Sequence, residues 1–368
     1  MSRIFFDYST MAAFHGHPTG IPRTVQELAI AFRNVREDIR IVALNDEIRE
    51  FRDFDVETKK FGSVADIRNG DWLISTSAGW SFSTYNQIVM RLTKQGVRYI
   101  QLYYDLIPYL FPHFYKDPGF GDYFCRWTAE NFNLCTRALF ISQCGQDDIV
   151  RCIVGRKSNI PLQVIRLGET MPTSRNSANK IPDKLTRLGR FALSVGTLEI
   201  RKNHIILLNA YRFLIENGFD ALPALVLAGR EGWLNNHLSY QVENDPVLKG
   251  RILVMPDASD AALDYLYKNC IFTLFPSLYE GWGLPIAESL NYGKPCISSS
   301  TSSMVEVAPK YTRFAHPVKL REWVDHIQEL SANDKILTDE SNRIAREYSP
   351  FLWEQTALDI LEKLKNIS

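Results

Sequence analysis

The chain has 368 residues, of which 45% are apolar and 12% aromatic. This length suits two domains of ordinary size, and this composition excludes wholesale disorder. The 42 basic residues balance the 42 acidic ones, so a globally basic protein that binds nucleic acid is excluded.

The N-terminal segment has too short an apolar stretch for a signal peptide. No later apolar run approaches the roughly 20 residues that span a bilayer. We therefore expect a cytoplasmic protein. A peripheral contact with the inner face of the membrane stays open at this point, as does the oligomeric state.

Short apolar runs alternate with amphipathic stretches in the first part of the chain. The strand candidates are residues 3–9, 39–44, 71–76, 97–105 and 137–143. Residues 24–34 and 83–96 are helix candidates between them, and this alternation predicts crossover connections and a parallel sheet. Residues 46–60 mix both charge signs and are expected to form a solvated surface.

A polar stretch at residues 168–189 predicts a linker, after which a second alternation begins. Its strand candidates are residues 190–196, 224–229, 251–255, 271–277 and 294–300, and a helix is expected from about Ile205 to Asn217. We expect an N-terminal α/β domain at 1–170 and a C-terminal α/β domain at 171–348. Ser349-Pro350 indicates a helix start, so we expect a terminal helix within 349–368.

Residues 271–298 carry the pattern of strand, glycine loop, short helix and strand. Gly281 and Gly283 lie in the loop, Pro285 suits the first helical position, and Gly293 suits the helix end. The loop then lies at the carboxyl end of a parallel strand, where ligands bind in open α/β sheets. The free N–H groups of the first helical turn attract a diphosphate there.

Two carboxylates, with seven residues between them, flank this loop. Glu280 precedes the glycines, and Glu288 falls in the first turns of the helix. A carboxylate near a helix N-terminus can stay ionised and accept hydrogen bonds from sugar hydroxyls. An isolated pair of this kind is more often structural, but the surrounding pattern favours a sugar site.

Residues 194–204, SVGTLEIRKNH, form a second informative segment. Gly196 ends a strand, and Arg201 and Lys202 come just before a helix. Arginine by bidentate hydrogen bonding, and lysine as a point charge, can neutralise a leaving diphosphate. An Arg-Lys pair alone is usually a surface feature, so its place at a strand end matters.

A loop rich in glycine and histidine follows the first strand and leads into a helix. It contains His15, Gly16, His17, Thr19 and Gly20, and Arg23 falls in the first turn of the helix. A plain strand-to-helix connection and a ligand-binding loop are equally consistent with this pattern.

These three segments, in this order, resemble the family 4 retaining glycosyltransferases of the GT-B fold. EGWGLPIAE at 280–288 looks like the E-x7-E signature, VGTLEIRKN at 195–203 like the phosphate-binding stretch, and TGIPRTVQEL at 19–28 like the N-terminal glycine loop. The similarity spans the chain and is strongest at about 190–310. It implies an α/β GT-B architecture of two Rossmann-like doubly wound domains that face each other across a cleft, with the last helix crossing back to the N-terminal domain.

The resemblance also implies residue roles. Glu288 would hold the donor ribose and Glu280 the transferred sugar, while backbone N–H groups of the glycine loop would meet the sugar and the β-phosphate. The implied catalytic residues are Glu280, Arg201 and Lys202. The implied donor-binding residues are Glu288, Gly281, Trp282, Gly283, Leu284, Gly20 and Gly196, and the implied acceptor-side residues are His15, His17, Arg23, Asp105 and Tyr104.

Two positions depart from the pattern of many members. Tyr104 precedes Asp105 where those members have His before Asp, and Thr197 follows Gly196 where they have Arg. Arg201 is expected to take over the second role. The eleven aromatic residues from Tyr99 to Trp127 are mostly expected in the core, with an acceptor platform and a lipid contact as alternatives.

The activity that the resemblance implies is retaining transfer of a hexosyl residue, with GDP-mannose favoured, to a glycan or lipid-linked oligosaccharide. The setting would be bacterial surface polysaccharide or lipopolysaccharide synthesis, with front-side attack favoured over a covalent intermediate on Glu280. A nucleotide-sugar epimerase of the same fold and a non-catalytic GT-B-like binding subunit are the alternatives. A dehydrogenase is excluded because no Gly-x-Gly-x-x-Gly follows a strand.

No cofactor and no metal are expected, because the nucleotide sugar is itself a substrate. The chain does contain an Asp-x-Asp triplet of the kind that holds metals, Asp53-Phe54-Asp55. Its flanks are charged and no apolar strand leads into it, so we expect it to bind no metal.

Overall fold

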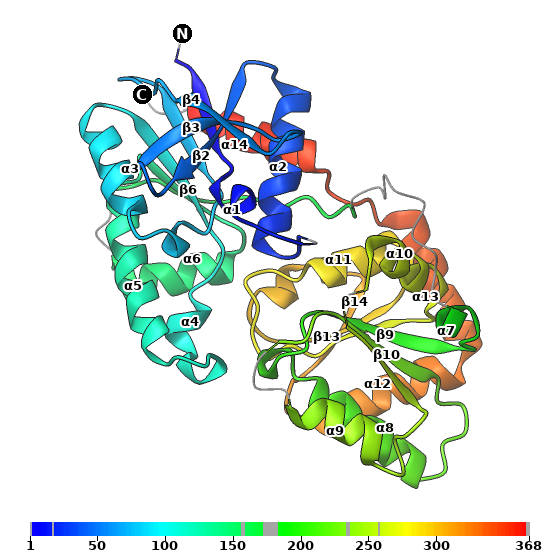
Figure 1. Ribbon diagram of the computed structural model, residues 1–368. Coiled ribbons are helices and arrows are strands. Elements are labelled where there is room, and N and C mark those ends of the chain that lie inside the picture. Colours follow the sequence, from blue (N-terminus) through cyan, green and yellow to red (C-terminus); the bar gives the residue numbers. More distant parts are fainter. Residues whose placement is uncertain are drawn as a thin grey trace. The chain divides into compact units, whose positions relative to one another are not determined.

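A computed structural model describes residues 2–16, 18–155, 159–171, 183–232, 236–256 and 258–365. The chain divides into two compact units. Unit 1 consists of Met1–Pro112, Pro118–Gly168 and Phe351–Ser368, and unit 2 of His113–Asp117 and Glu169–Pro350. Each unit is built around its own β-sheet (Figure 1).

The sheet of unit 1 has the strand order β4-β3-β2-β1-β5-β6-β7-β8 in the described residues. Its strands are β1 (Ile4–Asp7), β2 (Ile39–Asn45), β3 (Glu50–Asp55), β4 (Lys60–Val64), β5 (Trp72–Ser75), β6 (Arg98–Tyr103), β7 (Arg137–Phe140) and β8 (Leu162–Val164). β3 pairs antiparallel with both β2 and β4, and the other pairings are parallel, as the alternation of elements predicts.

The prediction that residues 46–60 form only a solvated surface is wrong. This segment contains β3 and the first residue of β4, and Phe51 and Phe54 of β3 are buried. The register shifts between Arg52 and Phe54, as at a β-bulge. The extra residue of this irregularity lies in β4, while β3 pairs with β2 in regular register. Phe51 and Phe54 are three positions apart and so face opposite sides of the sheet, which leaves β3 without the alternation that signals a half-buried strand.

Helices cover both faces of the sheet of unit 1. They are α1 (Ser9–Ala12), α2 (Ile21–Val35), α3 (Tyr85–Lys94), α4 (Ile107–Leu110), α5 (Gly119–Phe132), α6 (Gln143–Ile149) and α14 (Trp353–Lys365). α14 packs along α2 (Figure 1), while α3 and α5 contribute to a core that includes Tyr85 and Trp127. α14 begins four residues after the predicted Ser349, and six of the eleven aromatic residues from 99 to 127 are buried.

The sheet of unit 2 has the order β11-β10-β9-β12-β13-β14 in the described residues, and all its pairings are parallel. Its strands are β9 (Phe191–Val195), β10 (Ala224–Ala228), β11 (Ile252–Met255), β12 (Thr273–Phe275), β13 (Cys296–Ser299) and β14 (Thr312–Ala315). In chain order this is 3-2-1-4-5-6, the order of the doubly wound dinucleotide-binding fold. The direction of strand addition reverses between β9 and β12.

Two layers of helices sandwich this sheet (Figure 1). The helices are α7 (Asp183–Thr186), α8 (His204–Glu216), α9 (Asn236–Asn244), α10 (Asp260–Asn269), α11 (Leu284–Asn291), α12 (Leu320–Ala332) and α13 (Asp334–Glu347). α8, α9 and α12 share one apolar cluster, and the remaining helices contribute to clusters on the other face. Much of the predicted linker lies outside the described residues, but its end is structured, because Leu185 of α7 is fully buried in unit 2.

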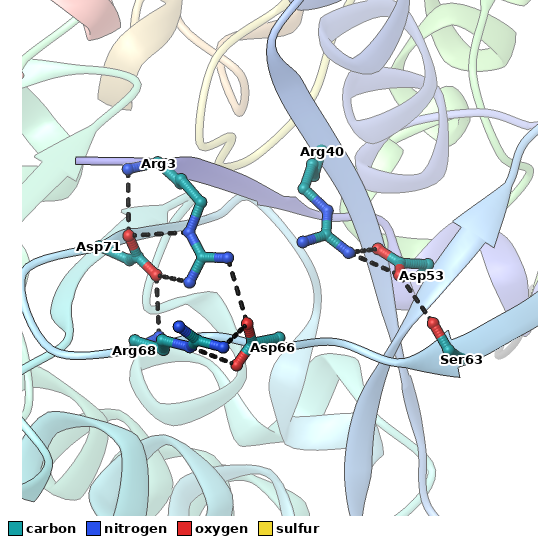
Figure 2. Close-up of polar contacts among 7 residues, drawn as sticks. All are labelled: Arg3, Arg40, Asp53, Ser63, Asp66, Arg68 and Asp71. Atoms are coloured by element: carbon teal, nitrogen blue, oxygen red, sulfur yellow. Dashed lines mark hydrogen bonds and ion pairs between the residues drawn. The ribbon is translucent and has the colours of Figure 1, made fainter. Parts of the chain in front are cut away.

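The Asp-x-Asp triplet lies at the end of the mixed, partly charged strand β3. Figure 2 shows Asp53 beside Arg40, with one guanidinium nitrogen 2.7 and 2.6 Å from its two carboxylate oxygens, and Ser63 donating to the same carboxylate. Asp55 accepts hydrogen bonds from the backbone N–H groups of Glu57 and Thr58. Both carboxylates are therefore engaged in holding the β3–β4 hairpin.

Across the described residues, no helix combines the length and the apolar character needed to cross a bilayer.

Candidate functional site

The candidate site lies in unit 2, at the carboxyl edge of its sheet. β9 and β12 are neighbours there, and the chain order reverses between them. After β9 the chain passes through Gly196 and a short 3₁₀ turn, Ile200–Lys202, into α8. After β12 it passes through residues 276–283 into α11. Because parallel strands end at the same edge, the sheet brings these two loops together.

Arg201, Lys202 and Glu280 meet at this edge. Arg201 Nη1 lies 2.6 Å from Glu280 Oε2, and Lys202 Nζ lies 2.6 Å from Glu280 Oε1. Each side chain keeps only 11 to 16% of its surface exposed. Three of the residues that the sequence predicts for catalysis are therefore in direct contact.

The electrostatics of the cluster favour a permanently ionised Glu280. Burial by itself would raise the pKa of this carboxyl, but the charges of Arg201 and Lys202 outweigh it and lower the pKa to about 2. His204, the first residue of α8, behaves differently. Burial and then the charge of Lys202 lower its pKa to about 3, so it is neutral at ordinary pH.

The glycine loop leads directly into α11, as the sequence predicts. Gly283 precedes the helix with φ +158°, and Pro285 stands in its first turn. A Cβ on Gly283 would lie 2.9 Å from the side chain of Ile286, so a larger residue does not fit there without a shift. Gly293, with φ +68°, follows the helix end. The first-turn N–H groups of α11 thus stand at the same edge as the cations.

Glu288, on α11, takes part in a different set of contacts. It is buried, and its Oε2 accepts a hydrogen bond of 2.7 Å from the hydroxyl of Tyr267 on α10. Tyr267 stacks on Tyr292 with ring centroids 5.2 Å apart. The sequence pattern found Glu288 but did not reveal Tyr267, because the two residues are adjacent only through helix packing.

The predicted loop in unit 1 does not follow β1 directly, because the short helix α1 (Ser9–Ala12) lies between them. Gly20 caps α2 with φ +56°, His15 is exposed, and Arg23 lies in the first turn of α2. His17 lies outside the described residues.

The residues that depart from the family pattern also have clear positions. The hydroxyl of Tyr104 is buried and donates a 2.7 Å hydrogen bond to the carbonyl of Thr76. Asp105 accepts a hydrogen bond from the N–H of Ile107. Thr197 lies in the loop after β9, and its carbonyl accepts a hydrogen bond from the N–H of Glu199.

Trp282 lies in the loop between β12 and α11, and its side chain packs against apolar residues. The indole contributes to the apolar cluster formed by Phe275, Ile286 and other residues around α11. Leu284 begins α11.

Sequence reasoning missed two supports of the cluster. Glu199, only 3% exposed, accepts a 2.6 Å hydrogen bond from Arg201 Nη2, so Arg201 bridges Glu199 and Glu280. Ser302 and Ser303, which follow β13, contact the backbone of the Glu280 loop. Glu199 stands two residues before Arg201 and was visible in the motif, whereas the serines carry no local signal.

Comparison with known proteins fits this geometry. Residues 179–348 match the family described as "Glycosyl transferases group 1". This stretch of the chain is a glycosyl transferases group 1 domain. The group 1 domain contains the contact between Glu280, Arg201 and Lys202 and the whole sheet of unit 2.

Curated relatives of the group 1 domain include bacterial mannosyltransferases. The chain is 31% identical to the O-antigen chain mannosyltransferase B of Escherichia coli over 48% of this chain and 45% of that protein. It is 25% identical to the serotype-specific mannosyltransferase WbdA of Escherichia coli over 69% of this chain and 32% of that protein. The chain thus spans less than half the length of these relatives.

Solved structures show the fold of the whole chain. A sucrose-phosphate synthase from Thermosynechococcus elongatus has a TM-score of 0.71 at 14% identity. The match covers 99% of this chain and 98% of that chain. Anabaena HepE in complex with UDP and glucose has a TM-score of 0.69 at 14% identity over the full length of both chains. These neighbours are GT-B proteins, so the predicted fold class of two parallel-sheet α/β domains is confirmed.

Proposed function

We propose that this protein is a retaining glycosyltransferase that works without a metal. In this proposal it transfers a hexosyl residue from a nucleotide diphosphate sugar to a hydroxyl of a glycan or lipid-linked oligosaccharide. The observation that supports it best is the contact of both cations with Glu280 inside a group 1 domain.

Arg201 and Lys202 supply the charge that a diphosphate needs. They form a fixed, largely buried pair of cations, and the N–H groups at the start of α11 stand at the same edge. A bound diphosphate competes with Glu280 for these cations. Donor binding then transfers hydrogen bonds from the carboxylate to phosphate oxygens and frees Glu280 for the sugar hydroxyls, while Glu288 holds the ribose.

The proposed reaction is a front-side displacement. The acceptor oxygen bonds to the anomeric carbon on the face from which the phosphate leaves, the bond from that carbon to the phosphate oxygen breaks, and the leaving β-phosphate takes the acceptor proton. Negative charge grows on the departing diphosphate, where Arg201 and Lys202 stabilise it. Fixed cations do here what a divalent metal does in other transferases, so no metal is needed.

The two units divide the substrates in this proposal. Residues 171–348 bind the donor, and residues 1–170 bind the acceptor through His15, His17, Arg23, Tyr104 and Asp105. Gly20 approaches the donor. We place the protein in the cytoplasm, peripheral at the inner face of the membrane.

GDP-mannose is the favoured donor because two of the relatives are named as mannosyltransferases. Their names also point to O-antigen synthesis, and we extend that setting, bacterial surface polysaccharide, to this chain. A further relative is named as a UDP-Gal-dependent galactosyltransferase, so the donor must be tested rather than assumed.

A screen of nucleotide sugars tests the proposal. GDP-mannose, UDP-galactose and UDP-glucose are each added to the protein, and the midpoint of thermal unfolding is measured. A donor that binds only the folded state at 100 times its Kd stabilises it by about 2.7 kcal/mol, which is easily detected. If no nucleotide sugar raises the midpoint, the proposal fails.

Product analysis separates the proposal from its alternatives. With the stabilising donor and a lipid-linked oligosaccharide acceptor, we expect a new glycosidic bond with the anomeric configuration of the donor, measured from the one-bond C–H coupling at the anomeric carbon. Inversion of that configuration would contradict retention. Consumption of the donor without an acceptor would indicate the epimerase.

A further inference from the structure

Three consecutive hydroxyl residues after β13 hold the backbone of the loop that carries Glu280. Thr301 Oγ1 donates to the carbonyl of Leu278 at 3.0 Å. Ser302 Oγ accepts from the N–H of Glu280 at 2.9 Å. Ser303 Oγ lies 2.7 Å from the carbonyl of Glu280 and 2.9 Å from that of Trp282, and shares its single hydrogen between them. Both backbone polar groups of Glu280 are therefore bound by neighbouring serines.

Ser302 occupies this position in a conformation that serine seldom adopts. Its φ is +50°, in the left-handed region that glycine favours. Such a backbone persists only where the surrounding structure stabilises it, and such residues gather at functional sites. In this case the left-handed turn coincides with the hydrogen bond to the N–H of Glu280.

The opposite side of the same loop is held by Arg201. Its Nη1 donates to the carbonyl of Tyr279 at 2.8 Å, and its own carbonyl accepts from the N–H of Leu278. The loop is thus fixed between the hydroxyl run on one side and the cation segment on the other. A shift of the Glu280 backbone would change how its carboxylate meets Arg201 and Lys202.

We propose that Ser302 is a positioning residue, whose hydroxyl fixes the Glu280 backbone. The carboxylate then meets Arg201 and Lys202 in the free protein and stands in the correct place for the transferred sugar once the diphosphate has taken over these cations. This inference rests on the proposed function. The strained turn at Ser302 then affects turnover but not donor affinity, because the cations hold the diphosphate.

Two substitutions that both remove the hydroxyl separate positioning from mere stability. Ser302→Gly relieves the left-handed backbone and is expected to leave the midpoint of thermal unfolding unchanged or raised. Ser302→Ala keeps the strain and is expected to lower it. If Ser302 positions Glu280, kcat falls about tenfold in both variants and the KM for the donor changes less than twofold. Ser300→Gly, at the exposed residue two positions earlier, is the matched control and keeps wild-type kcat.

If instead Ser302 only stabilises the turn, activity will follow stability, and Ser302→Gly will be as active as the wild type. That result overturns the inference and leaves the proposed function standing. A wild type that transfers no sugar overturns the proposed function.

A readout without substrate then decides the positioning role. Selective ¹³C labelling of glutamate carboxyls, with Glu280→Gln to assign the signal, gives the pKa of Glu280. We expect it to rise by about one unit in both Ser302 variants, and an unchanged pKa contradicts positioning.

Discussion

Each unit of the molecule places a carboxylate at or just beyond the carboxyl end of a central parallel strand, and these two carboxylates, Asp7 and Glu280, are held in opposite ways. Asp7 ends β1 in unit 1, fully buried, and accepts hydrogen bonds from the hydroxyls of Ser9, Ser75 and Tyr85 and from the N–H of Ser9. Glu280 in unit 2 is held by two cations. The same chemical group therefore sits in a neutral network in one unit and in an ionic one in the other.

The pKa values move in opposite directions for this reason. Burial raises the pKa of Asp7, and the hydrogen bonds of Ser9, Tyr85 and Ser75 only partly offset that rise. The cations lower the pKa of Glu280 to about 2. Burial alone makes an ionised carboxylate costly, and in unit 2 two fixed opposite charges offset that cost at Glu280. This difference leads us to assign a structural role to Asp7 and a functional one to Glu280.

The largest effect is expected when each carboxylate is replaced by its amide. Glu280→Gln should lower kcat by about 10²–10³, the range for loss of an electrostatic contact made in the transition state. Asp7→Asn should leave kcat within about threefold and instead lower the free energy of unfolding by about 1–3 kcal/mol. Initial rates and urea unfolding measure the two. A folded Asp7→Asn variant as inactive as Glu280→Gln would break the comparison.

The pH dependence of stability should also differ in sign. Above its ordinary pKa of 4.5, Glu280 makes its full contribution to the free energy of unfolding. This contribution, about 3 kcal/mol at most, is lost as the pH falls towards 2. The contribution of Asp7 is complete below its ordinary pKa of 3.8 and is lost as the pH rises through the raised folded value. Urea unfolding of the wild type and both amide variants from pH 2.5 to 7 measures this. The expectation is contradicted if the stability difference from the wild type changes in the same direction with pH for both amide variants.

A smaller effect on catalysis is expected when the side chain at position 201 changes its shape but keeps its positive charge. Arg201 contacts Glu199, Glu280 and the carbonyl of Tyr279 at once, which a lysine cannot do. Arg201→Lys should lower kcat/KM about tenfold. Arg190→Lys, on an exposed ion pair, is the control and should change nothing. Wild-type kcat/KM in Arg201→Lys would show that charge alone suffices.

The smallest effect is expected from removing metal ions. If the cations of unit 2 neutralise the diphosphate, adding about 10 mM EDTA to the assay should change the rate less than about twofold. The rate is measured before and after addition of excess Mg²⁺. Loss of activity on chelation, restored by Mg²⁺ or Mn²⁺, would contradict a metal-free mechanism.

The sequence by itself determined the class of fold and the position of the Glu280 loop. Buried parallel strands are continuous apolar runs, so they could be read directly, and glycine and proline mark the turn into α11. β3 was not readable because its two buried phenylalanines, Phe51 and Phe54, face opposite sides of the sheet, and β14 was missed because its four residues, Thr312–Ala315, form no apolar run. These signals are all local, since each depends on a window of a few residues.

The tertiary structure alone decided which groups touch. Arg201 and Glu280 are far apart in the chain, and Lys202 is 78 positions from Glu280, yet the strand order makes their loops neighbours. The same order brings Ser302 to the backbone of Glu280. No local pattern encodes such contacts, because they follow from which strands pair. The sequence could name the acid and the cations, but only the sheet could turn them into one site.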